Sequence, residues 1–575
     1  MSREADLPTD RTVDRRAFLR RAGALTAAAS TGALGSTLMP AAAAAVGSPA
    51  RALRMPEVVP PQVSNPAFLS VAEAAAAIRT RELSSVELVE ACLDRVRRLD
   101  GLYMAFNTVL EDQALATARA ADRASAQGVS IGALHGIPLA IKDNYYTAGV
   151  RTTANSHIFA DFVPEYDAEA WARLAARGAI LLGKTQMGPL ATSRATTPDG
   201  QATTMNAWAP SDPSVSPGGS SSGSATAVAS RMALSSTGTQ TGGSITNPSG
   251  AQGLTGLKPT MGRVSLRGII PLTYTRDHPG PLARDAMDAA IMMAIMAGPD
   301  RGDPRTLGQP RLPDLVTAAT PVSRGGRPGL RWPTRIGVIE GYLDGPDLVE
   351  LISPNAPPEE RARWERRQAS EARGHAQAAA RRVMLDTFRQ LGAEIVSVEL
   401  PRDWDVLTSG SFNNVRLPER SEPFLEVLRD DVRKFGVSLS PWINGLLLPG
   451  TEYLRGQRAK LLLLQRILDD LFAQCDVVVQ TSPLPFDIVG LPLIAFPVGF
   501  HGMGDSALPL GSVLGGQPWA EDRLLSLVAA YQEVTDWHRR RPVDPAQDEL
   551  GEVVPALRVG ERGRIDVWEV DAFGQ

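Results

Sequence analysis

The chain has 575 residues, of which 43% are hydrophobic and 21% charged, a composition that suits a globular protein with a sizeable core. Its 59 basic and 63 acidic residues give a net charge of −4, which argues against nucleic acid or an anionic membrane surface as a partner. Two cysteines far apart and six scattered histidines show no disulfide framework and no metal-ligand spacing. Cys92 is expected to be a buried free thiol, and a disulfide with Cys475 stays open.

Residues 1–45 have the pattern of a twin-arginine export signal. Paired arginines lie in Asp14–Arg20, an Ala-rich apolar run follows to Met39, and several A-x-A cleavage sites lie in the alanine run that ends at Ala45. Gly, Ser and Thr dilute the apolar run, which is too weakly hydrophobic for a stable membrane anchor. The sequence therefore predicts a signal peptide over 1–45, a linker over 46–65 and an exported protein, periplasmic or extracellular.

Helical and strand patterns alternate through the rest of the chain. Capping boxes at Ser70–Glu73 and Ser84–Glu87 open two helices, at about 70–80 and 85–99. Further helices are expected at about 111–127, 168–177, 284–297, 357–391 and 521–540, and strands at 137–142, 179–182, 335–339, 394–399, 476–479 and, as the last one, 493–498. This alternation predicts an α/β fold with a buried sheet. Two Pro/Gly-rich stretches, at about 301–333 and 344–360, are expected to be insertions, and 543–575 a C-terminal tail.

The segment 217–256 is rich in glycine and serine and contains no lysine, histidine, aspartate or glutamate. One interpretation is a flexible linker. Against it, Ala225–Met232 is compact, apolar and helix-prone, and Ala233–Thr237 has the character of a short strand. Glycines allow backbone amides to face an oxyanion, and serine offers a nucleophile or a proton relay. A serine nucleophile needs a base, which must come from elsewhere in the chain.

Residues 178–185 match the phosphate-binding pattern GxxxxGK[ST]. A phosphate-binding loop exposes its amides between a strand and a helix. Here the four intervening residues are Ala-Ile-Leu-Leu, which are expected to form a buried strand. Nucleotide binding is therefore not predicted.

The base is either a histidine or a lysine. His135, His157 and His278 follow no triad spacing, and no G-x-S-x-G motif is present. Lys142 ends the apolar strand that begins at Ile137, where desolvation lowers a lysine pKa and favours the neutral amine. A lysine that extends to solvent at a strand end is the alternative, and the residues alone leave the two open.

Four motifs in order resemble those of the amidase signature family. They are Gly136–Asn144 (GIPLAIKDN), Pro217–Ser224 (PGGSSSGS), Gly238–Ile245 (GTQTGGSI) and Gly256–Thr260 (GLKPT). The resemblance spans about 66–542 and includes Lys184-Thr185 as a strand end. It implies one catalytic domain on a twisted mixed sheet flanked by helices on both faces, with no cofactor and no metal. Among members of the family, the stretch 256–298 looks closer to bacterial peptide amidases than to the tRNA-amidating subunit.

The resemblance also implies a serine amidohydrolase mechanism. Ser244 is the nucleophile, Ser220, held by a cis peptide, is the relay 24 residues earlier, and Lys142 is the base. The oxyanion hole is expected to be formed by the backbone N–H groups of Thr241, Gly242, Gly243 and Ser244. Other polar residues are expected to support the site: Asp143, Asn144, Ser221, Ser224 and Gln240. Asp277 resembles a loop residue near the site without an assigned chemical role.

Two residues depart from the family pattern. Gln240 stands where an acidic residue is usual, which predicts different hydrogen bonding in the nucleophile loop. Ser222 replaces a glycine, which matters only if the backbone φ is positive there.

The expected activity is hydrolysis of carboxamide C–N bonds in a small-molecule or peptide amide, with a homodimer left open. The alternatives are an inactive secreted binding protein of the same fold, an esterase or carbamate hydrolase, and a Ser-His-Asp esterase that uses His278 or His157.

Overall fold

The structure is a computed structural model that describes residues 53–130, 132–347, 357–502, 504 and 507–546. The predicted signal peptide over 1–45 and most of the predicted C-terminal tail lie outside these residues. Within them, no helix is both long and apolar enough to span a membrane. Cys92 and Cys475 are both buried free thiols.

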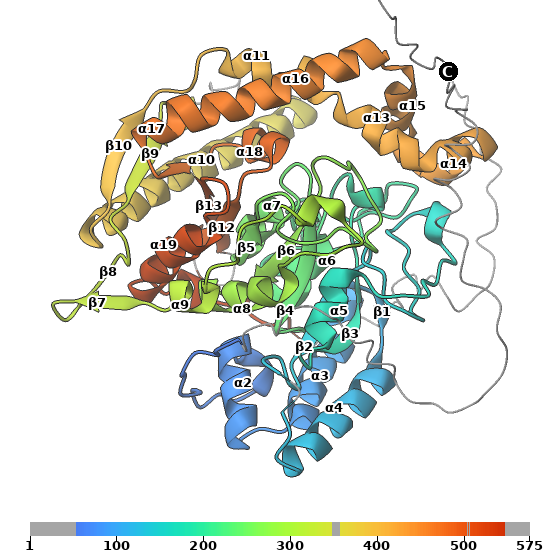
Figure 1. The fold of residues 1–575 in the computed structure, drawn as a ribbon, viewed down its shortest axis with the longest axis vertical. Helices are drawn as coiled ribbons and strands as arrows, with labels where there is room; N and C mark the ends of the chain where they lie inside the picture. The colour runs from blue at the N-terminus through green and yellow to red at the C-terminus, as the bar shows by residue number, and fades with distance from the viewer. Residues whose placement is uncertain (1–52, 131, 348–356, 503, 505–506, 547–575) are drawn as a thin grey trace, which may run out of the picture. The chain divides into compact units, whose positions relative to one another are not determined.

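One large mixed sheet organises the chain (Figure 1). Its eleven strands lie in the order β1-β3-β2-β4-β6-β5-β12-β13-β11-β9-β10. Parallel pairs occur towards the two ends, β3-β2-β4 and β11-β9-β10, and the pairs between them are antiparallel. The strands are β1 Phe106–Val109, β2 Pro138–Lys142, β3 Ile180–Thr185, β4 Ser235–Gln240, β5 Thr255–Lys258, β6 His278–Ala283, β9 Arg335–Ile339, β10 Glu394–Val398, β11 Val477–Val479, β12 Leu493–His501 and β13 Leu508–Gly516.

Helices cover both faces of this sheet. Successive strand residues point to opposite faces, and in β11 they join different apolar clusters: Val477 and Val479 join the main core, and Val478 joins a second one. The main core contains α8 Ala286–Met296, α10 Pro358–Gln390 and α19 Glu521–Glu533, and the second contains α16 Gly450–Arg466 and α18 Leu484–Val489. The α/β fold with a mixed sheet flanked by helices is thus confirmed.

The N-terminal helices begin where the sequence predicts. In α2 Val71–Thr80 and α3 Ser85–Tyr103, the Ser70 and Ser84 hydroxyls accept from the N–H groups of Glu73 and Glu87, and both reciprocal bonds are present. The remaining helices up to the middle of the chain are α4 Glu111–Ala126, α5 Glu169–Ala175, α6 Ser222–Ala229, α7 Thr246–Gln252 and α9 Leu315–Ala319. The segment 217–256 is therefore built of regular elements and is not a linker.

Four strands of the large sheet were not predicted: β1, β5, β6 and β13. In β6 and β13, proline and glycine conceal the strand pattern. The strand β6 reads His-Pro-Gly-Pro-Leu-Ala, and β13 carries one proline and three glycines, so neither resembles a central strand. The strand β12, expected to be the last, is followed by β13, its antiparallel partner. Residues 301–333 also hold more structure than expected: α9 packs against α8 and α19, and β7 Val322–Arg324 pairs with β8 Arg327–Gly329.

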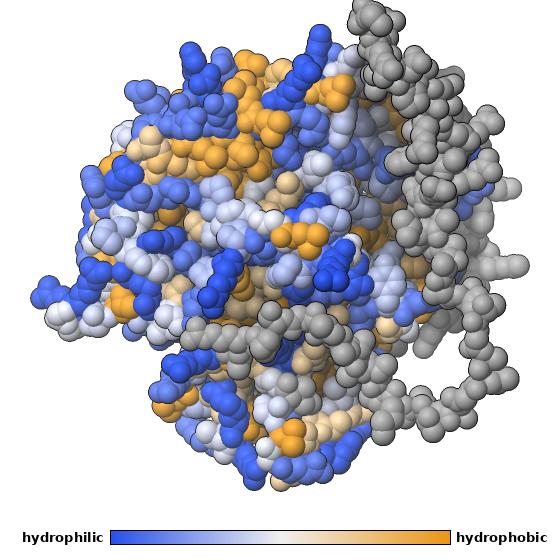
Figure 2. All heavy atoms as spheres, in the orientation of Figure 1, coloured by the Kyte–Doolittle hydropathy of each residue, from blue (hydrophilic) through white to orange (hydrophobic). Residues whose placement is uncertain are grey.

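A group of helices between β10 and β11 lies next to the segment that follows β2. They are α11 Trp404–Thr408, α12 Gly410–Asn413, α13 Arg416–Ser421, α14 Leu425–Asp430, α15 Leu439–Leu447, α16 and α17 Phe472–Gln474. Phe424 and Trp442 from this group share an apolar cluster with Leu190 and Ile270. Exposed leucines lie on α15, at Leu446 and Leu447, and on α16, at Leu454, Leu461 and Leu462. Figure 2 shows apolar surface over α16.

Candidate active site

Lys142 is the last residue of β2, a strand that lies between β3 and β4. Its side chain is fully buried, and Nζ lies 2.8 Å from Ser220 Oγ and 2.8 Å from Thr239 Oγ1. Burial lowers the pKa of Lys142 to about 7, and the Asp277 carboxylate acts in the opposite direction. The lysine does not extend to solvent. It is held neutral in a substantial fraction of molecules near pH 7, and a neutral amine can accept a proton.

Ser220 lies in the loop that leads into α6, and the Gly219–Ser220 peptide bond is cis. Gly218 has φ +77°, and a Cβ there would lie 2.4 Å from Pro248 Cα, so the loop requires glycine at this position. The Ser220 carbonyl accepts a hydrogen bond of 3.0 Å from the Gly188 N–H. These contacts fix the Ser220 hydroxyl against the amine of Lys142.

Ser244 follows β4, which is a parallel neighbour of β2, so the loop leaves the sheet at the edge where Lys142 ends. Ser244 is 8% exposed, whereas Lys142 and Ser220 are 0% and 1% exposed. Gly243 has φ +96°, and a Cβ there would lie 2.4 Å from Asn247 Nδ2. Ser244 is therefore the most accessible of the three residues.

Most backbone amides of this loop have no acceptor within the described residues. No hydrogen bond leaves the N–H of Thr241, Gly242 or Ser244 towards that part of the chain. The Gly243 N–H differs, because it faces the Asp487 carboxyl. Burial raises the pKa of Asp487, and the Gly243 N–H offsets part of that rise. Unsatisfied amides beside a serine hydroxyl can stabilise an oxyanion.

Gln240 orders the nucleophile loop with both ends of its amide. Its Oε1 accepts from the N–H groups of Ile245 and Thr246 at 2.8 and 2.9 Å, and its Nε2 donates to Asp487 at 2.9 and 3.1 Å. The Asp487 carboxylate in turn lies 3.5 Å from Lys258 Nζ. The acidic residue usual at position 240 would accept hydrogen bonds from the loop, and Gln240 Oε1 accepts them instead. An amide fits at this position because its nitrogen can donate to the Asp487 carboxylate.

The other predicted supporting residues lie around Lys142. Asp143 Oδ1 lies 3.2 Å from Lys184 Nζ, and both side chains are fully buried. Asn144 Nδ2 donates to Thr239 Oγ1 at 3.2 Å. Lys184, the lysine of the false phosphate-loop match, lies within strand β3 and donates to Thr152 and to the Tyr145 carbonyl.

Two of the three serines that follow Ser220 in this loop and helix make structural hydrogen bonds. Ser222 is the first residue of α6 and is not among the residues with positive φ; its Oγ donates to the Gly218 carbonyl at 2.6 Å and accepts from the Ala195 N–H. Ser224 Oγ donates to the Thr237 carbonyl at 2.8 Å. Ser221 Oγ is buried without a hydrogen-bond partner in the described part of the chain.

Three residues of the site were missed or left without a role. The Thr239 hydroxyl contacts both Lys142 and Asn144, and only its place on β4 next to β2 could have revealed it. Asp277 accepts from the Thr241 hydroxyl and from the Leu272 N–H at 2.8 Å, and burial raises its pKa. Arg276 donates to the Thr241 carbonyl at 2.9 Å.

The histidines do not form a triad with either serine. His278 lies in β6, and its Nδ1 contacts the Gln240 carbonyl at 3.2 Å. Burial lowers the pKa of His278 well below its usual value, and Lys258 adds to the effect. His157 lies in a short 3-10 helix, where it is partly exposed, and His135 contacts Ser125 and the Ala121 carbonyl. None of them hydrogen-bonds Ser220 or Ser244 within the described residues.

Comparison with known proteins agrees with this arrangement. A family model described as Amidase matches residues 87–341. A glutamyl-tRNA(Gln) amidotransferase subunit of Chloroflexus aurantiacus is 34% identical over 522 residues, which cover 82% of this chain and 98% of that protein.

This chain belongs to the amidase signature family. The corresponding subunit of Methylococcus capsulatus is also 34% identical over 522 residues, with the same coverage of 82% and 98%. Among solved structures, the peptide amidase of Stenotrophomonas maltophilia matches with a TM-score of 0.67 and 28% identity over 83% of this chain and 98% of that one. As an amidase, the chain is an amide hydrolase.

The expectation of an exported amidase, periplasmic or extracellular, is wrong. The relatives that match 82% of this chain are named as subunits of a tRNA amidotransferase, a name that contradicts export. The segment 1–45, on which the expectation rested, lies outside the described residues. A twin-arginine pattern alone is therefore not sufficient evidence that this amidase is exported.

Proposed function

We propose that this amidase cleaves carboxamide C–N bonds through an acyl-enzyme on Ser244, with Ser220 as the proton relay and Lys142 as the base. The observation that carries the proposal is a fully buried lysine, with a pKa lowered to about 7, whose Nζ lies 2.8 Å from a serine hydroxyl. A lysine of ordinary pKa, about 10.4, would be protonated at neutral pH and unable to accept a proton.

In the first half of the reaction, Ser244 Oγ attacks the amide carbonyl. Its proton passes to Ser220 Oγ as the Ser220 proton passes to neutral Lys142, so the charge ends on the lysine. The backbone N–H groups of Thr241, Gly242, Gly243 and Ser244 are the proposed oxyanion donors. Of these, Gly243 is the weakest candidate because its N–H faces Asp487.

In the second half, the protonated Lys142 returns its proton through Ser220 to the leaving nitrogen, and the C–N bond breaks. Water then attacks the Ser244 ester, and Lys142 again takes a proton through the same relay. In a molecule that starts the reaction with neutral Lys142, the amine carries a positive charge only between these steps. The Thr239 hydroxyl and the Asp277 carboxylate stabilise the charged amine while it lasts.

Substitution of the nucleophile and the base tests the proposal. Ser244→Ala should abolish amide turnover, and Lys142→Ala should lower kcat/KM by about 10³-fold near neutral pH, because each removes a group that forms or breaks a bond. The measurement is turnover of a panel of peptide amides, anilides, fatty amides and p-nitrophenyl esters. Ser249→Ala is the matched control: it removes a buried hydroxyl of the same segment that has no hydrogen-bond partner in the described residues.

The panel also separates the alternatives. Full activity in Lys142→Ala together with loss in His278→Ala would replace the lysine mechanism by a histidine one. Faster turnover of esters than of every amide would make ester cleavage the main activity.

A further inference from the structure

A cavity of about 170 Å³ lies beside the second apolar cluster, at the ends of β9 and β11. The segment after β10 and the helices α11 and α18 complete its wall. Apolar side chains form most of that wall, among them Trp404, Leu471 and Leu484. An apolar cavity of about 150 Å³ in another protein binds benzene. The volume is therefore enough for a six-membered ring.

This cavity is distinct from the catalytic site. β11 lies five places from β4 in the sheet, and five successive antiparallel pairs make the two strands run in opposite directions. Followed from strand to strand, the pairing puts Gln480 level with Ser236 near the start of β4, whereas Ser244 follows the end of β4. No lining residue hydrogen-bonds Lys142, Ser220 or Ser244 within the described chain.

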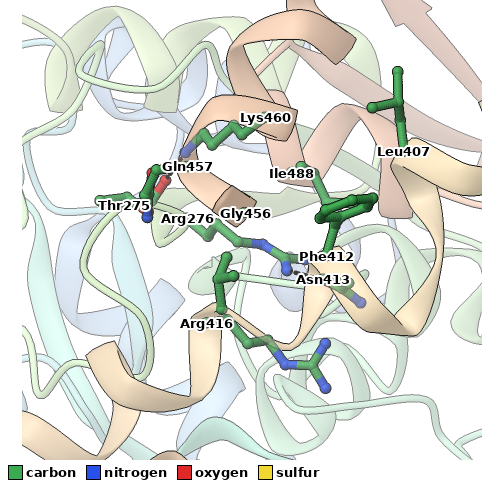
Figure 3. Close-up of a pocket in the computed structure, with 11 residues that line it drawn as sticks. Thr275, Arg276, Leu407, Phe412, Asn413, Arg416, Gly456, Gln457, Lys460 and Ile488 are labelled. Atoms are coloured by element: carbon green, nitrogen blue, oxygen red, sulfur yellow. Dashed lines mark hydrogen bonds between the residues drawn. The ribbon is translucent and has the colours of Figure 1, made fainter. Parts of the chain in front are cut away.

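The lining of this cavity is neutral, unlike that of the smaller cavity beside α13 (Figure 3). The smaller one has a volume of about 10 Å³, and arginine and lysine side chains line it. Helix α11 contributes to both: Leu407 lines the smaller cavity, and Trp404 and Thr408 line the larger one. No charged residue of the described chain lines the larger cavity. It therefore favours a neutral ligand, because a charged ligand would lose its hydration without gaining a counter-ion.

Gln480 supplies a buried polar side chain to this neutral cavity. It comes two residues after Val478 and so lies on the sheet face that carries the second apolar cluster. Gln480 is only 8% exposed, and its carboxamide forms no hydrogen bond with the described residues, although its backbone N–H donates to the Val513 carbonyl at 2.9 Å. A Cβ at Gly515 would lie 2.9 Å from Gln480 Nε2, so glycine leaves room for the carboxamide. A buried carboxamide needs hydrogen-bonding partners, and here they must come from outside this part of the chain.

We propose that this cavity is a second binding site, which takes a neutral six-membered ring with an N–H next to a C=O. The carboxamide of Gln480 has a donor and an acceptor side by side, and a cyclic amide edge matches both. The ring itself packs against Trp404 and the apolar wall. The site goes beyond the proposed function, because it needs none of the catalytic residues.

Calorimetry with 2-pyridone tests the ligand class on the full-length wild type. This probe is a neutral six-membered ring whose N–H and C=O are adjacent. We expect it to bind with a Kd below about 1 mM, a strength that is reasonable for so small a ligand. N-methyl-2-pyridone has lost the donor and should bind at least about 10-fold more weakly.

Two substitutions test the location. Gln480→Met removes both hydrogen-bonding atoms at similar size and should weaken 2-pyridone binding at least about 10-fold. Thr408→Phe fills the cavity and should abolish binding while the circular dichroism spectrum stays that of the wild type. Thr117→Phe is the matched control and should bind 2-pyridone as the wild type does. Thr117 is exposed on α4 and, like Thr408, donates to the carbonyl four residues earlier at 2.8 Å.

Several outcomes would overturn the proposal. Equal binding of 2-pyridone to the wild type and to Thr408→Phe would place the probe elsewhere, and equal binding to Gln480→Met would remove the role of the carboxamide. No binding at a concentration of about 10 mM would mean that the cavity takes no such ring. Benzoate binding that Thr408→Phe removes would contradict a neutral ligand. None of these results bears on the acyl-enzyme mechanism, which the amide panel tests separately.

Discussion

At the scale of single residues, Lys142 is a charged side chain placed where charge is disfavoured. The same burial that suits Lys142 to its proposed role as base also makes its protonated form costly to the fold, with the pKa lowered to about 7 from its usual value of about 10. Between these two pH values the unfolded chain binds more protons than the folded one, so the contribution of this group to stability rises with pH across that window. Below pH 7 the full cost of burying the ammonium group is present.

Lys142→Met should therefore stabilise the protein, and more so at low pH. We expect its free energy of unfolding to exceed that of the wild type by about 2–5 kcal/mol near pH 6, with the difference shrinking towards pH 10. Urea denaturation at several pH values measures it. Lys434→Met replaces a surface lysine. Its free energy of unfolding should differ from that of the wild type by an amount that does not shrink between pH 6 and pH 10. A constant difference for Lys142→Met would contradict the lowered pKa.

Gln240 offers a second prediction at this scale, because its amide nitrogen faces the Asp487 carboxylate. Gln240→Glu would place two carboxylates within hydrogen-bonding distance in a buried site, where both cannot be ionised. We expect a loss of about 2–4 kcal/mol in unfolding free energy near pH 8, and a smaller loss near pH 5 where one carboxyl is protonated. Thermal denaturation against pH measures it, with the exposed Gln113→Glu as the control.

At the scale of elements, α7 and β13 hold the nucleophile loop in place. Ser244 lies two residues before α7, and this helix approaches β13 so closely that a Cβ on Gly511 would lie 2.7 Å from Gly250 Cα. Glycine at position 511 is therefore a condition for the position of the loop.

Gly511→Ala should push α7 away from the sheet. Because the clash is with backbone, we expect a loss of about 1–3 kcal/mol in stability, together with at least about a 10-fold loss in kcat as the nucleophile moves. Gly450→Ala, at the start of α16 where a Cβ meets nothing within 4 Å, should leave both unchanged. Wild-type kcat in a destabilised Gly511→Ala protein would show that α7 does not position Ser244.

The same scale explains which elements the sequence revealed. Helices with capping boxes and strands with continuous apolar runs, such as α2, α3 and β2, were predicted near their observed bounds because local signals dominate there. The prolines and glycines of β6 and β13 conceal strands that exist through tertiary pairing and close packing. In the site, Lys142, Ser220 and Ser244 came from motif resemblance, whereas Thr239 became visible only with its neighbours in space.

At the scale of the whole molecule, the sheet assembles a site from segments far apart in the chain. The end of β2 supplies Lys142, and the loops around α6 and β4 supply Ser220, Ser244 and the backbone amides. The motifs that resemble those of the amidase family lie in both of these parts.

The pH dependence of kcat/KM tests the central claim, that a neutral Lys142 drives catalysis through Ser220, most directly. Because kcat/KM reports ionisations of the free enzyme, the account predicts a rise of about tenfold per pH unit on the acid side, an apparent pKa of about 7 and a plateau above it. A profile that is flat between pH 5 and 9, or that falls above pH 7, would contradict it.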